Sequence, residues 1–498
     1  MKNKILLINP KTTETPMADN RLLKLTGKWN VFPPIGLATI AGLTPSDFEV
    51  EIIDEDAQEI DFKKDCDIVG ITGYSRHVNR MIEIATTFKT YGKLVVAGGI
   101  GAHVHSDLVI PFVDVLFLGE CELTWPRFLK DWLQGKFQEL YDGGNRTDLS
   151  QYVQPRWDLI DLKSYSQLAI QASRGCHFNC DYCDVVAIFG NQLRTKPNDV
   201  VMKELTVAVS YGVNEVFFTD DNFAGNITKT KELLKAIRDL NRELAHPIRF
   251  STQATIDIAK DEELITLFKE ANFYSLYIGI ETSNMASLKQ ANKTPNITTD
   301  VSDAIKKIQS KGIYIVNGGM IGFDADEKHI FNQLNTYLTD NGLVVPTVAM
   351  LTARKGTRLW KRLELENRLC TDCSQDEFGV INFYPKHFSK EELEEEFMRF
   401  QKEILYLNST FIERLTNFLN QIDKDFYKKH CEKKGDVKNL FLGIKIITFF
   451  LFHKSKEHRI LIRKVLKLSA KYPSYYFPLI IELLVVFEYR REYIFSLQ

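Results

Sequence analysis

Three cysteines in the middle of the chain have the spacing of ligands to an iron–sulfur cluster. Cys176, Cys180 and Cys183 follow the pattern Cys-x3-Cys-x2-Cys, so one short loop carries all three thiolates. A [4Fe–4S] cluster has four irons, and each thiolate can bind one of them. The loop therefore supplies three ligands and leaves the fourth iron open to a substrate. We predict that these cysteines bind the cluster and form the catalytic centre.

Two other kinds of site could use these cysteines. A zinc site needs four closed ligands, usually from two Cys-x2-Cys pairs. The fourth ligand could be His177 inside the loop, or it could come from the distant pair Cys370 and Cys373. A disulfide framework is disfavoured, because eight cysteines in 498 residues are sparse and we expect no export signal. We therefore favour the cluster.

The residues around the cysteines make the loop more specific than its spacing alone. Arg174 and Gly175 precede the first cysteine, and Asp184 follows the third. With them the loop resembles the signature of the radical S-adenosylmethionine (SAM) superfamily. The resemblance implies that the amino and carboxylate groups of SAM bind the open iron and that one electron cleaves its sulfonium. It also implies an electron donor such as flavodoxin or ferredoxin.

The first third of the chain alternates short β-branched runs with helical stretches. This alternation predicts an α/β fold with a doubly wound parallel sheet of Rossmann-like type, which binds ligands at the carboxyl ends of its strands. The expected strands are Lys4–Ile8, Glu49–Ile53, Ile68–Thr72, Leu94–Ala97 and Val113–Leu118. The expected helices are Gly36–Leu43, Arg76–Tyr91 and His105–Ile110.

Glycines and polar residues follow several of these strands. Gly98 and Gly99 come directly after the fourth strand, where missing Cβ atoms let the backbone approach a large ligand, and Gly119–Glu120 follows the fifth. The stretch resembles the cobalamin-binding domain attached to many radical SAM enzymes. No Asp-x-His-x-x-Gly hexapeptide occurs, so we expect no histidine ligand from that motif below the cobalt. Arg76 or His77 could lie beneath the cobalt, or both could be solvated residues at a helix N-terminus.

From Leu168 the alternation of strands and helices starts again. Six strands suit the open, partial (β/α)6 barrel of radical SAM enzymes, in which active-site residues lie at the carboxyl ends of the strands. The expected strands are Ala169–Ala172, Val216–Thr219, Ile248–Thr252, Ser275–Ile280, Tyr314–Val316 and Thr347–Leu351. The expected helices are Val200–Tyr211, Lys229–Leu244, Asp261–Ala271 and Thr299–Lys311.

The ends of the barrel strands carry the candidate SAM-binding residues. Glu281 resembles the carboxylate of the family's Gly-Ile-Glu element, which contacts SAM, and a barrel-rim salt bridge is the alternative. Gly319 lies in a stretch that resembles the lining of the adenine site, and Phe178 has a position that often contributes to adenine binding. The remaining candidates, after the second strand, are Asp220, Asp221 and Asn222.

Further motifs resemble the subgroup that includes the hopanoid C2-methylases. They are Phe189–Gly190, Leu193–Lys196, Asp220–Asn226, Gly356–Leu363 and Asn382–Lys386. The resemblance implies a cobalamin-dependent methyltransferase, in which a 5′-deoxyadenosyl radical takes hydrogen from an unactivated carbon and methylcobalamin supplies the methyl group. One alternative is a cyclisation, a rearrangement or the transfer of another SAM-derived group. A second is a non-catalytic iron–sulfur sensor or binding module.

The last part of the chain is rich in apolar residues. Leu440–Phe452 and Tyr476–Phe487 are strongly apolar, which favours a helical cap whose apolar face packs on the barrel. The alternative is a groove for a lipid-like substrate, with basic pairs that suit anionic headgroups. The pairs are Lys454 with Lys456 and Arg490 with Arg491. We predict a cobalamin-binding domain over 1–145, a linker over 146–165, the partial barrel over 166–385 and a mostly α-helical domain over 386–498.

Composition limits the partners. Hydrophobic residues at 44% and charged residues at 26% are ordinary for a globular protein, and 498 residues suffice for two or three domains. A net charge of −2 gives no reason to expect nucleic acid. No apolar run is long enough for a transmembrane segment. We expect a small-molecule substrate, and reduced cluster thiolates without an export signal favour a cytoplasmic location.

Overall fold

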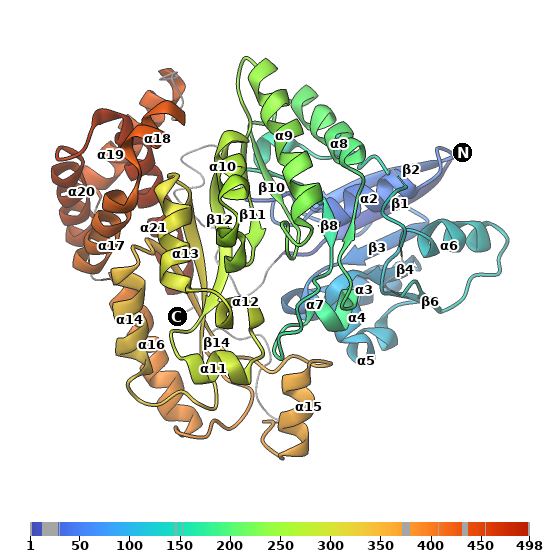
Figure 1. The fold of residues 1–498 in the computed structure, drawn as a ribbon. Helices are drawn as coiled ribbons and strands as arrows, with labels where there is room; N and C mark the ends of the chain where they lie inside the picture. Colours follow the sequence, from blue (N-terminus) through green and yellow to red (C-terminus); the bar gives the residue numbers. More distant parts are fainter. Residues whose placement is uncertain are drawn as a thin grey trace. The chain divides into compact units, whose positions relative to one another are not determined.

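The computed structural model describes residues 2–11, 28, 30–144, 147–151, 153–370, 379–406, 408–430, 437–453 and 455–496 (Figure 1). The chain divides into two compact units. The first comprises Met1–Cys176 and Val185–Thr219, and the second comprises His177–Asp184 and Asp220–Ser496. Both contain parallel strands and helices, which confirms the predicted α/β class. The boundaries of the four predicted segments stay a prediction.

The first sheet is entirely parallel and has the order β2-β1-β3-β4-β5-β6. All five strands expected from the sequence are present. The sixth strand was not predicted, because three residues are too few to show an alternating pattern. The strands are β1 (Asn3–Asn9), β2 (Phe48–Asp54), β3 (Ile68–Thr72), β4 (Leu94–Gly98), β5 (Val115–Leu118) and β6 (Leu140–Asp142).

Helices cover both faces of this sheet. Leu6 and Ile8 of β1 pack on one face in a core shared with α3, α4 and α5. Ile5 and Leu7 pack on the opposite face with α2 and α6. The sheet is therefore doubly wound, as predicted. The helices are α2 (Ile35–Leu43), α3 (Val78–Thr90), α4 (Gly99–Val104), α5 (Ser106–Val109) and α6 (Thr124–Leu133).

The second sheet contains the six predicted barrel strands, in the order β14-β13-β12-β11-β10-β7. The pairings β7 with β10 and β11 through β14 are parallel. The strands are β7 (Leu168–Ile170), β10 (Glu215–Phe218), β11 (Arg249–Ala254), β12 (Phe273–Glu281), β13 (Tyr314–Ile321) and β14 (Val345–Met350). The predicted helices are α8 (Asn198–Ser210), α9 (Ile227–Glu243), α10 (Glu262–Glu270) and α13 (Val301–Ser310). The partial barrel is thus confirmed.

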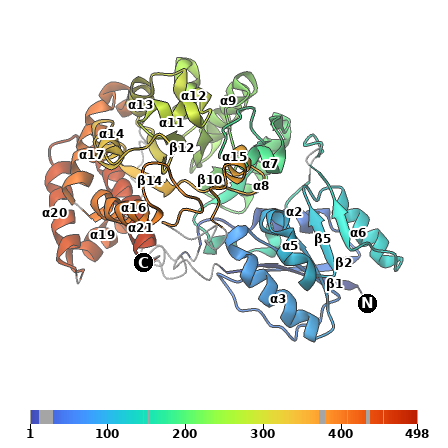
Figure 2. The same cartoon turned by 90° about the horizontal axis from the view of Figure 1, so that it is seen from below.

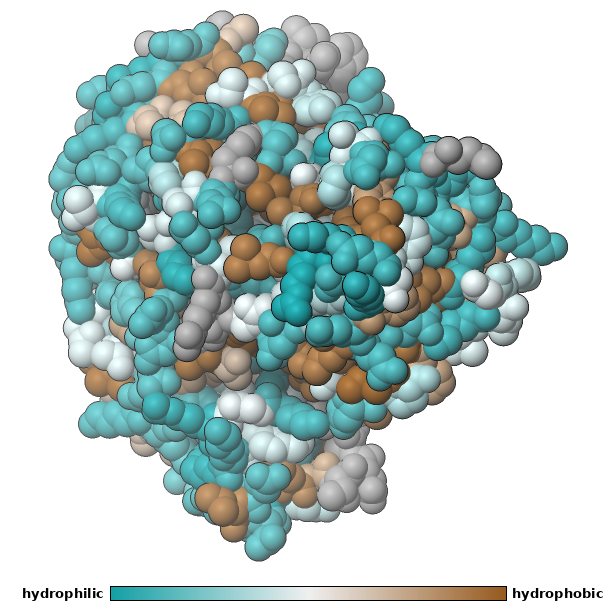
Figure 3. Space-filling model, turned by 90° about the vertical axis from the view of Figure 1, so that its right-hand side faces the viewer, coloured by the Kyte–Doolittle hydropathy of each residue, from teal (hydrophilic) through white to brown (hydrophobic). Residues whose placement is uncertain are grey.

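The C-terminal region is helical, as predicted, and α17, α19, α20 and α21 lie side by side (Figure 2). No helix in the described ranges is long and apolar enough to cross a membrane. Hydrophilic and hydrophobic residues are mixed over the face of the molecule that Figure 3 shows. The helices are α16 (Lys390–Tyr406), α17 (Asn408–Gln421), α18 (Lys424–His430), α19 (Val437–Leu451), α20 (Lys456–Ser469) and α21 (Phe477–Ser496).

Charged residues of α21 pair within the protein. Glu482 lies 2.7 Å from Arg249 and accepts a hydrogen bond from Tyr314 at 3.2 Å. Arg491 is buried and lies 2.6 Å from Glu488. The expectation that Arg491 could meet an anionic headgroup is therefore wrong, because its guanidinium is turned inward. Lys454 lies outside the described residues.

Candidate functional site

The cysteine loop lies between the two strands of a short antiparallel pair, β8 (Ser173–Arg174) and β9 (Arg194–Thr195). Cys176, Cys180 and Cys183 form no disulfide and are partly exposed, and the N–H of Cys183 donates to the Cys180 carbonyl at 3.2 Å. No group of three His, Cys, Asp or Glu side chains in the described ranges is arranged as a metal site. Three cysteine thiols on one loop are the donor set that a [4Fe–4S] cluster with one open iron requires. Their binding of the cluster stays a prediction.

The alternative zinc site loses one of its ligands. Cys370 is disulfide-bonded, so its sulfur is not available to a metal. Cys373 lies outside the described residues, and His177 is an exposed side chain on the cysteine loop. The structure thus gives the zinc interpretation no complete ligand set among the residues that it describes.

In the second unit, the rest of the cysteine loop is held by backbone contacts. The Asp181 N–H donates to the Ala291 carbonyl at 3.0 Å, and the Leu359 N–H donates to the Asp181 carbonyl at 2.8 Å. Asn292 donates through Nδ2 to the Asn179 carbonyl at 2.9 Å. Leu359 belongs to α15 (Arg358–Leu365), which carries part of the Gly356–Leu363 motif. That motif therefore helps to fix the loop, which its sequence did not reveal.

Glu281 ends β12 in an unusual backbone conformation. Its φ is +66°, and the register with β13 shifts between Gly279 and Glu281. Its carboxylate is almost fully buried and lies 2.6 Å from the Nζ of Lys293. A non-glycine residue in this region costs on the order of 1–3 kcal/mol, and such residues cluster at ligand sites. The salt bridge foreseen as the alternative is present, but it is buried. Sequence reasoning missed Lys293 altogether.

The charges of the cysteine loop reach this carboxylate–lysine pair. Burial lowers the pKa of Lys293, but the charges of Glu281 and Cys180 outweigh it and raise that pKa overall. Burial raises the pKa of Tyr182, and the charges of Glu281, Cys180 and Cys183 raise it further. Glu281, Lys293 and two predicted cluster ligands thus form one electrostatic neighbourhood. A carboxylate here can accept the ammonium or ribose hydroxyls of SAM.

The polar residues after β10 are buried. Asp220 and Asn222 are 0% and 1% exposed, and Asp221 is half-buried. Both amide atoms of Asn222 lack a hydrogen-bond partner among the described residues. Buried polar groups are normally paired, so an unpaired amide marks a place for a ligand. Asn222 therefore fits the predicted SAM site.

The two predicted adenine-site residues lie on different elements. Phe178 is half-buried on the cysteine loop, with its ring 4.2 Å from that of His177. Gly319 is buried in β13, where a Cβ atom would lie 3.2 Å from Nδ2 of Asn317 and 3.3 Å from Val348. A Cβ atom there would make both neighbours shift by a few tenths of an ångström. The contact of either residue with adenine stays a prediction.

At the carboxyl edge of the first sheet, two glycines face protein atoms. A Cβ atom on Gly99, whose φ is +85°, would lie 2.2 Å from Oγ1 of Thr72. A Cβ atom on Gly98 would lie 3.3 Å from Cβ of Phe117. Both glycines therefore let α4 start close against β3 and β5. Their predicted contact with cobalamin is not needed to explain them and stays a prediction.

His77 and Arg76 lie after β3 at the same edge. Arg76 is exposed but His77 is 4% exposed, so the alternative that both are solvated is wrong for His77. Its Nδ1 accepts the Tyr74 N–H at 3.1 Å, and Arg76 Nε lies 3.4 Å from its Nε2. Burial and the charge of Arg76 lower the pKa of His77 to about 4, so the ring is neutral at pH 7. Both ring nitrogens are turned to neighbours in the loop, and whether either residue lies beneath a cobalt stays a prediction.

Residues 170–333 match the family model "Radical SAM superfamily", and residues 357–494 match a domain of unknown function, DUF4070. A Synechocystis protein named as an uncharacterized methyltransferase is 32% identical over 76% of this chain and 72% of its own length. Hopanoid C-2 methylase of Rhodopseudomonas palustris is 28% identical over 69% of this chain and 66% of that protein.

Two solved structures share the fold. TsrM from Kitasatospora setae, a radical SAM methyltransferase with cobalamin and a [4Fe–4S] cluster bound, has a TM-score of 0.62 and 16% identity over 94% of this chain and 100% of that chain. OxsB, a cobalamin-dependent SAM radical enzyme with aqua-cobalamin and SAM bound, has a TM-score of 0.65 and 13% identity over 100% of this chain and 80% of that chain. Together with the family model and the 32% identical relative, the fold and the cysteine loop lead to one conclusion. The chain belongs to the radical SAM superfamily and is an enzyme related to hopanoid C-2 methylase.

Proposed function

We propose that this radical SAM enzyme is a cobalamin-dependent methyltransferase that methylates an unactivated carbon of a small molecule. The observation that carries the cobalamin assignment is the first sheet. Its order β2-β1-β3-β4-β5 is flavodoxin-like, and such sheets bind their ligand at the β1/β3 switch point. The relatives named as methyltransferases support methyl as the transferred group. The bound cobalamin in TsrM and OxsB supports the corrin.

Each group has a place in this chain. When bound, the cluster and SAM supply a 5′-deoxyadenosyl radical and cobalamin supplies the methyl group. Cys176, Cys180 and Cys183 hold the cluster. Glu281 accepts hydrogen bonds from the SAM ammonium or ribose, and Asn222 uses its unpaired amide on the same ligand. Their burial excludes water, which would otherwise quench the radical chemistry and weaken each charge–dipole contact.

The test is anaerobic reconstitution with iron, sulfide and hydroxocobalamin, followed by SAM and a strong reductant. We expect corrin to stay bound through gel filtration and both 5′-deoxyadenosine and S-adenosylhomocysteine to form. 5′-Deoxyadenosine without corrin or S-adenosylhomocysteine would replace the proposal by another SAM-dependent radical reaction. An intact cluster that forms neither product would favour the iron–sulfur sensor and contradict the methyltransferase.

We propose further that the electron donor is an acidic carrier, such as flavodoxin or ferredoxin, that docks beside the cysteine loop. Arg354 lies 3.8 Å from Asp184 of the loop, and Arg358 lies 3.9 Å from Asp181. Both arginines are exposed, as are Lys355 and Lys361 in the same stretch. Exposed basic side chains next to a redox centre steer an acidic partner toward it.

Charge reversal tests this docking surface. The double variant Lys355→Glu/Lys361→Glu should slow cluster reduction by flavodoxin hydroquinone about tenfold at low salt. Reduction by dithionite, which needs no docking, should keep its rate. The control variant Lys306→Glu/Lys467→Glu changes two exposed lysines on α13 and α20 and should match the wild type. Equal slowing in both double variants would contradict a local docking surface.

We propose a small-molecule substrate in the cytoplasm, where cluster thiolates stay reduced. A lipid-like substrate draws no support from Arg491, which pairs with Glu488 inside the protein.

A further inference from the structure

One loop at the edge of the first sheet is clamped by its own backbone. The N–H of Glu120, directly after β5, donates to the Gly144 carbonyl at 2.8 Å, and the Gly143 N–H donates to Leu118 at 3.0 Å. A Cβ atom on Gly143 would lie 1.7 Å from the Glu120 carbonyl, and one on Gly119, whose φ is +66°, would lie 2.2 Å from the Gly144 carbonyl. Glycines therefore let the ends of β5 and β6 touch, which fixes where the Glu120 side chain starts.

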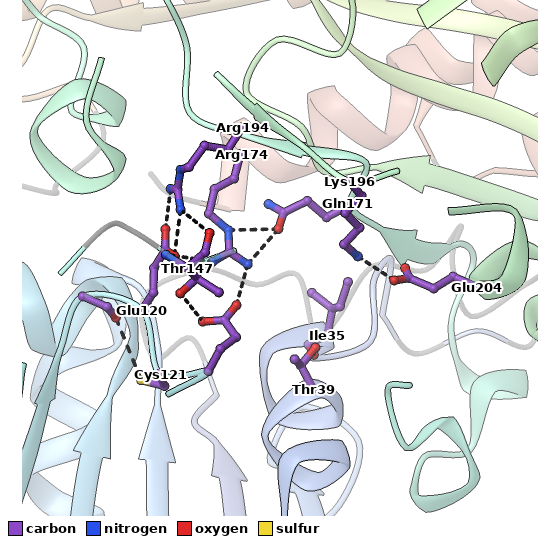
Figure 4. A network of polar contacts seen from close by, with 12 residues as sticks. Ile35, Thr39, Glu120, Cys121, Thr147, Gln171, Arg174, Arg194, Lys196 and Glu204 are labelled. Atoms are coloured by element: carbon purple, nitrogen blue, oxygen red, sulfur yellow. Dashed lines mark hydrogen bonds and ion pairs between the residues drawn. The ribbon is translucent and has the colours of Figure 1, made fainter. Parts of the chain in front are cut away.

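The carboxylate of Glu120 is buried and fully bonded (Figure 4). Nη1 of Arg194 donates to it at 2.9 Å, Nη1 of Arg174 lies 3.2 Å away, and the Thr147 N–H donates at 3.1 Å. Burial raises its pKa, but the two arginines outweigh burial and lower that pKa to about 2. Glu122 adds a second carboxylate 2.9 Å from Arg174. Two carboxylates thus balance two guanidinium groups.

Both arginines belong to the strand pair that leads into the cysteine loop. Arg174 of β8 and Arg194 of β9 are direct partners in the antiparallel register, and Cys176 follows Arg174 by two residues. One carboxylate therefore binds directly paired residues of both strands. We call this strand pair, β8 with β9, the ribbon. A guanidinium holds a carboxylate in a planar, directional geometry, so the contact fixes orientation as well as distance.

We infer that Glu120 is a positioning residue, which holds the ribbon ending at Cys176 at a set distance from the ligand edge of the first sheet. This inference rests on the proposed function, because that edge is where cobalamin is proposed to bind. Transfer of a methyl group needs the corrin and the SAM-derived radical in register. A buried ion network suits this task, because its charge-assisted hydrogen bonds are directional and fix one geometry.

The test variant is Glu120→Gln, which keeps the shape and removes the charge. The matched control is Glu204→Gln. Glu204 is equally buried and pairs with Lys196 on the same ribbon at 2.6 Å, but it belongs to α8 and not to the sheet edge. Both variants lose one buried carboxylate charge, so a purely structural effect of that loss should appear in both.

The first readout is the magnetic coupling between cob(II)alamin and the reduced cluster, measured by pulsed electron paramagnetic resonance in protein reconstituted with both. We expect Glu120→Gln to broaden the distance distribution and Glu204→Gln to leave it narrow. Unchanged coupling in Glu120→Gln, or equal broadening in both variants, would overturn the inference.

The second readout needs no corrin. We expect amide hydrogen exchange in residues 172–196 to be about tenfold faster in Glu120→Gln, with β1 and β3 unchanged, as expected for the loss of charge-assisted hydrogen bonds. Uniformly faster exchange would mean general destabilisation and no positioning role. Wild-type protein that retains no corrin would refute the cobalamin proposal, while the exchange pattern would still decide whether Glu120 holds the ribbon.

Discussion

Two buried carboxylates at strand ends, Glu120 and Glu281, are held in different ways. Glu120 in the first unit accepts two arginines and a backbone N–H, and neighbouring glycines take the unusual backbone conformation. Glu281 in the second unit pairs with the single amine of Lys293 and takes that conformation itself. A guanidinium fork fixes the plane and orientation of its partner carboxylate, whereas an ammonium is a point charge that imposes no such plane. Glu120 is therefore built as a permanent tie, and Glu281 as a carboxylate that can accept a ligand.

The backbone of Glu281 supports this distinction. Among the described residues, the non-glycine positions with positive φ are Asn272, Asn292, Asn367 and Glu281. Asparagine tolerates this region, because its short side chain bonds locally, but glutamate does not share that tolerance. The surroundings of Glu281 must stabilise this strained conformation, and such conformations cluster at ligand sites.

The largest effect should come from removing the three cysteines of the loop. Replacing Cys176, Cys180 and Cys183 together with alanine should abolish the cluster and all SAM cleavage, because no thiolate would remain to hold iron. Iron content, visible absorbance and 5′-deoxyadenosine formation measure this. The control is Cys121→Ala, since burial raises the pKa of the Cys121 thiol to about 12 and leaves it unreactive. SAM cleavage that survives the triple change would refute the radical assignment.

Replacing Glu281 should weaken SAM binding and leave the position of the ribbon unchanged. Glu281→Gln should weaken SAM binding to the reconstituted protein about 10- to 100-fold, the loss expected for one charge-assisted hydrogen bond in a buried site. Titration calorimetry measures the affinity. The magnetic coupling between cluster and cob(II)alamin should stay as in the wild type, the reverse of the result expected for Glu120→Gln. A variant that binds SAM normally would show that Glu281 is only the partner of Lys293.

The variants Glu120→Gln and Glu204→Gln should differ in how their unfolding free energy depends on acid pH. The pKa of Glu120 falls from 4.5 to about 2 in the fold, so its contribution is complete above pH 4.5 and is lost as the pH falls toward 2. The difference corresponds to about 3 kcal/mol. The unfolding free energy of Glu120→Gln should therefore fall less steeply in acid than that of the wild type. The groups that face Glu120 are Arg174, Arg194, Glu122 and Thr147.

Glu204 provides the control for this pH dependence. Burial raises its pKa despite Lys196, so protonation favours the folded state and Glu204→Gln should not flatten the acid limb. Denaturant titrations between pH 3 and pH 7 measure both variants. An acid limb in Glu120→Gln as steep as that of the wild type would contradict the role of Arg174 and Arg194 in lowering the Glu120 pKa.

The sequence predicted the helices, the strands and the residues at strand ends better than it predicted which charged residues pair. The strands of both sheets show as apolar runs, and Cys176, Cys180 and Cys183 share one loop, so local pattern suffices for them. Lys293 lies 12 residues beyond Glu281, and Arg194 lies 74 residues beyond Glu120. Only the path of the chain brings these charges together, and no period in the sequence encodes it. The glycines beside Glu120 carried a signal, but it reports backbone packing as readily as ligand approach.

Two glycine-to-alanine substitutions distinguish the backbone contact beside Glu120 from ordinary turn geometry. Gly119 and Gly135 have nearly the same φ, +66° and +65°, but a Cβ atom meets the Gly144 carbonyl only at Gly119 and nothing within 4 Å at Gly135. Gly135→Ala should cost about 1 kcal/mol of unfolding free energy, the strain of the left-handed region alone. Gly119→Ala should cost about 1–3 kcal/mol more, because the backbones of β5 and β6 must part. Equal costs would show that the contact with Gly144 yields freely, and Glu120 would then lack the rigid base that a positioning residue needs.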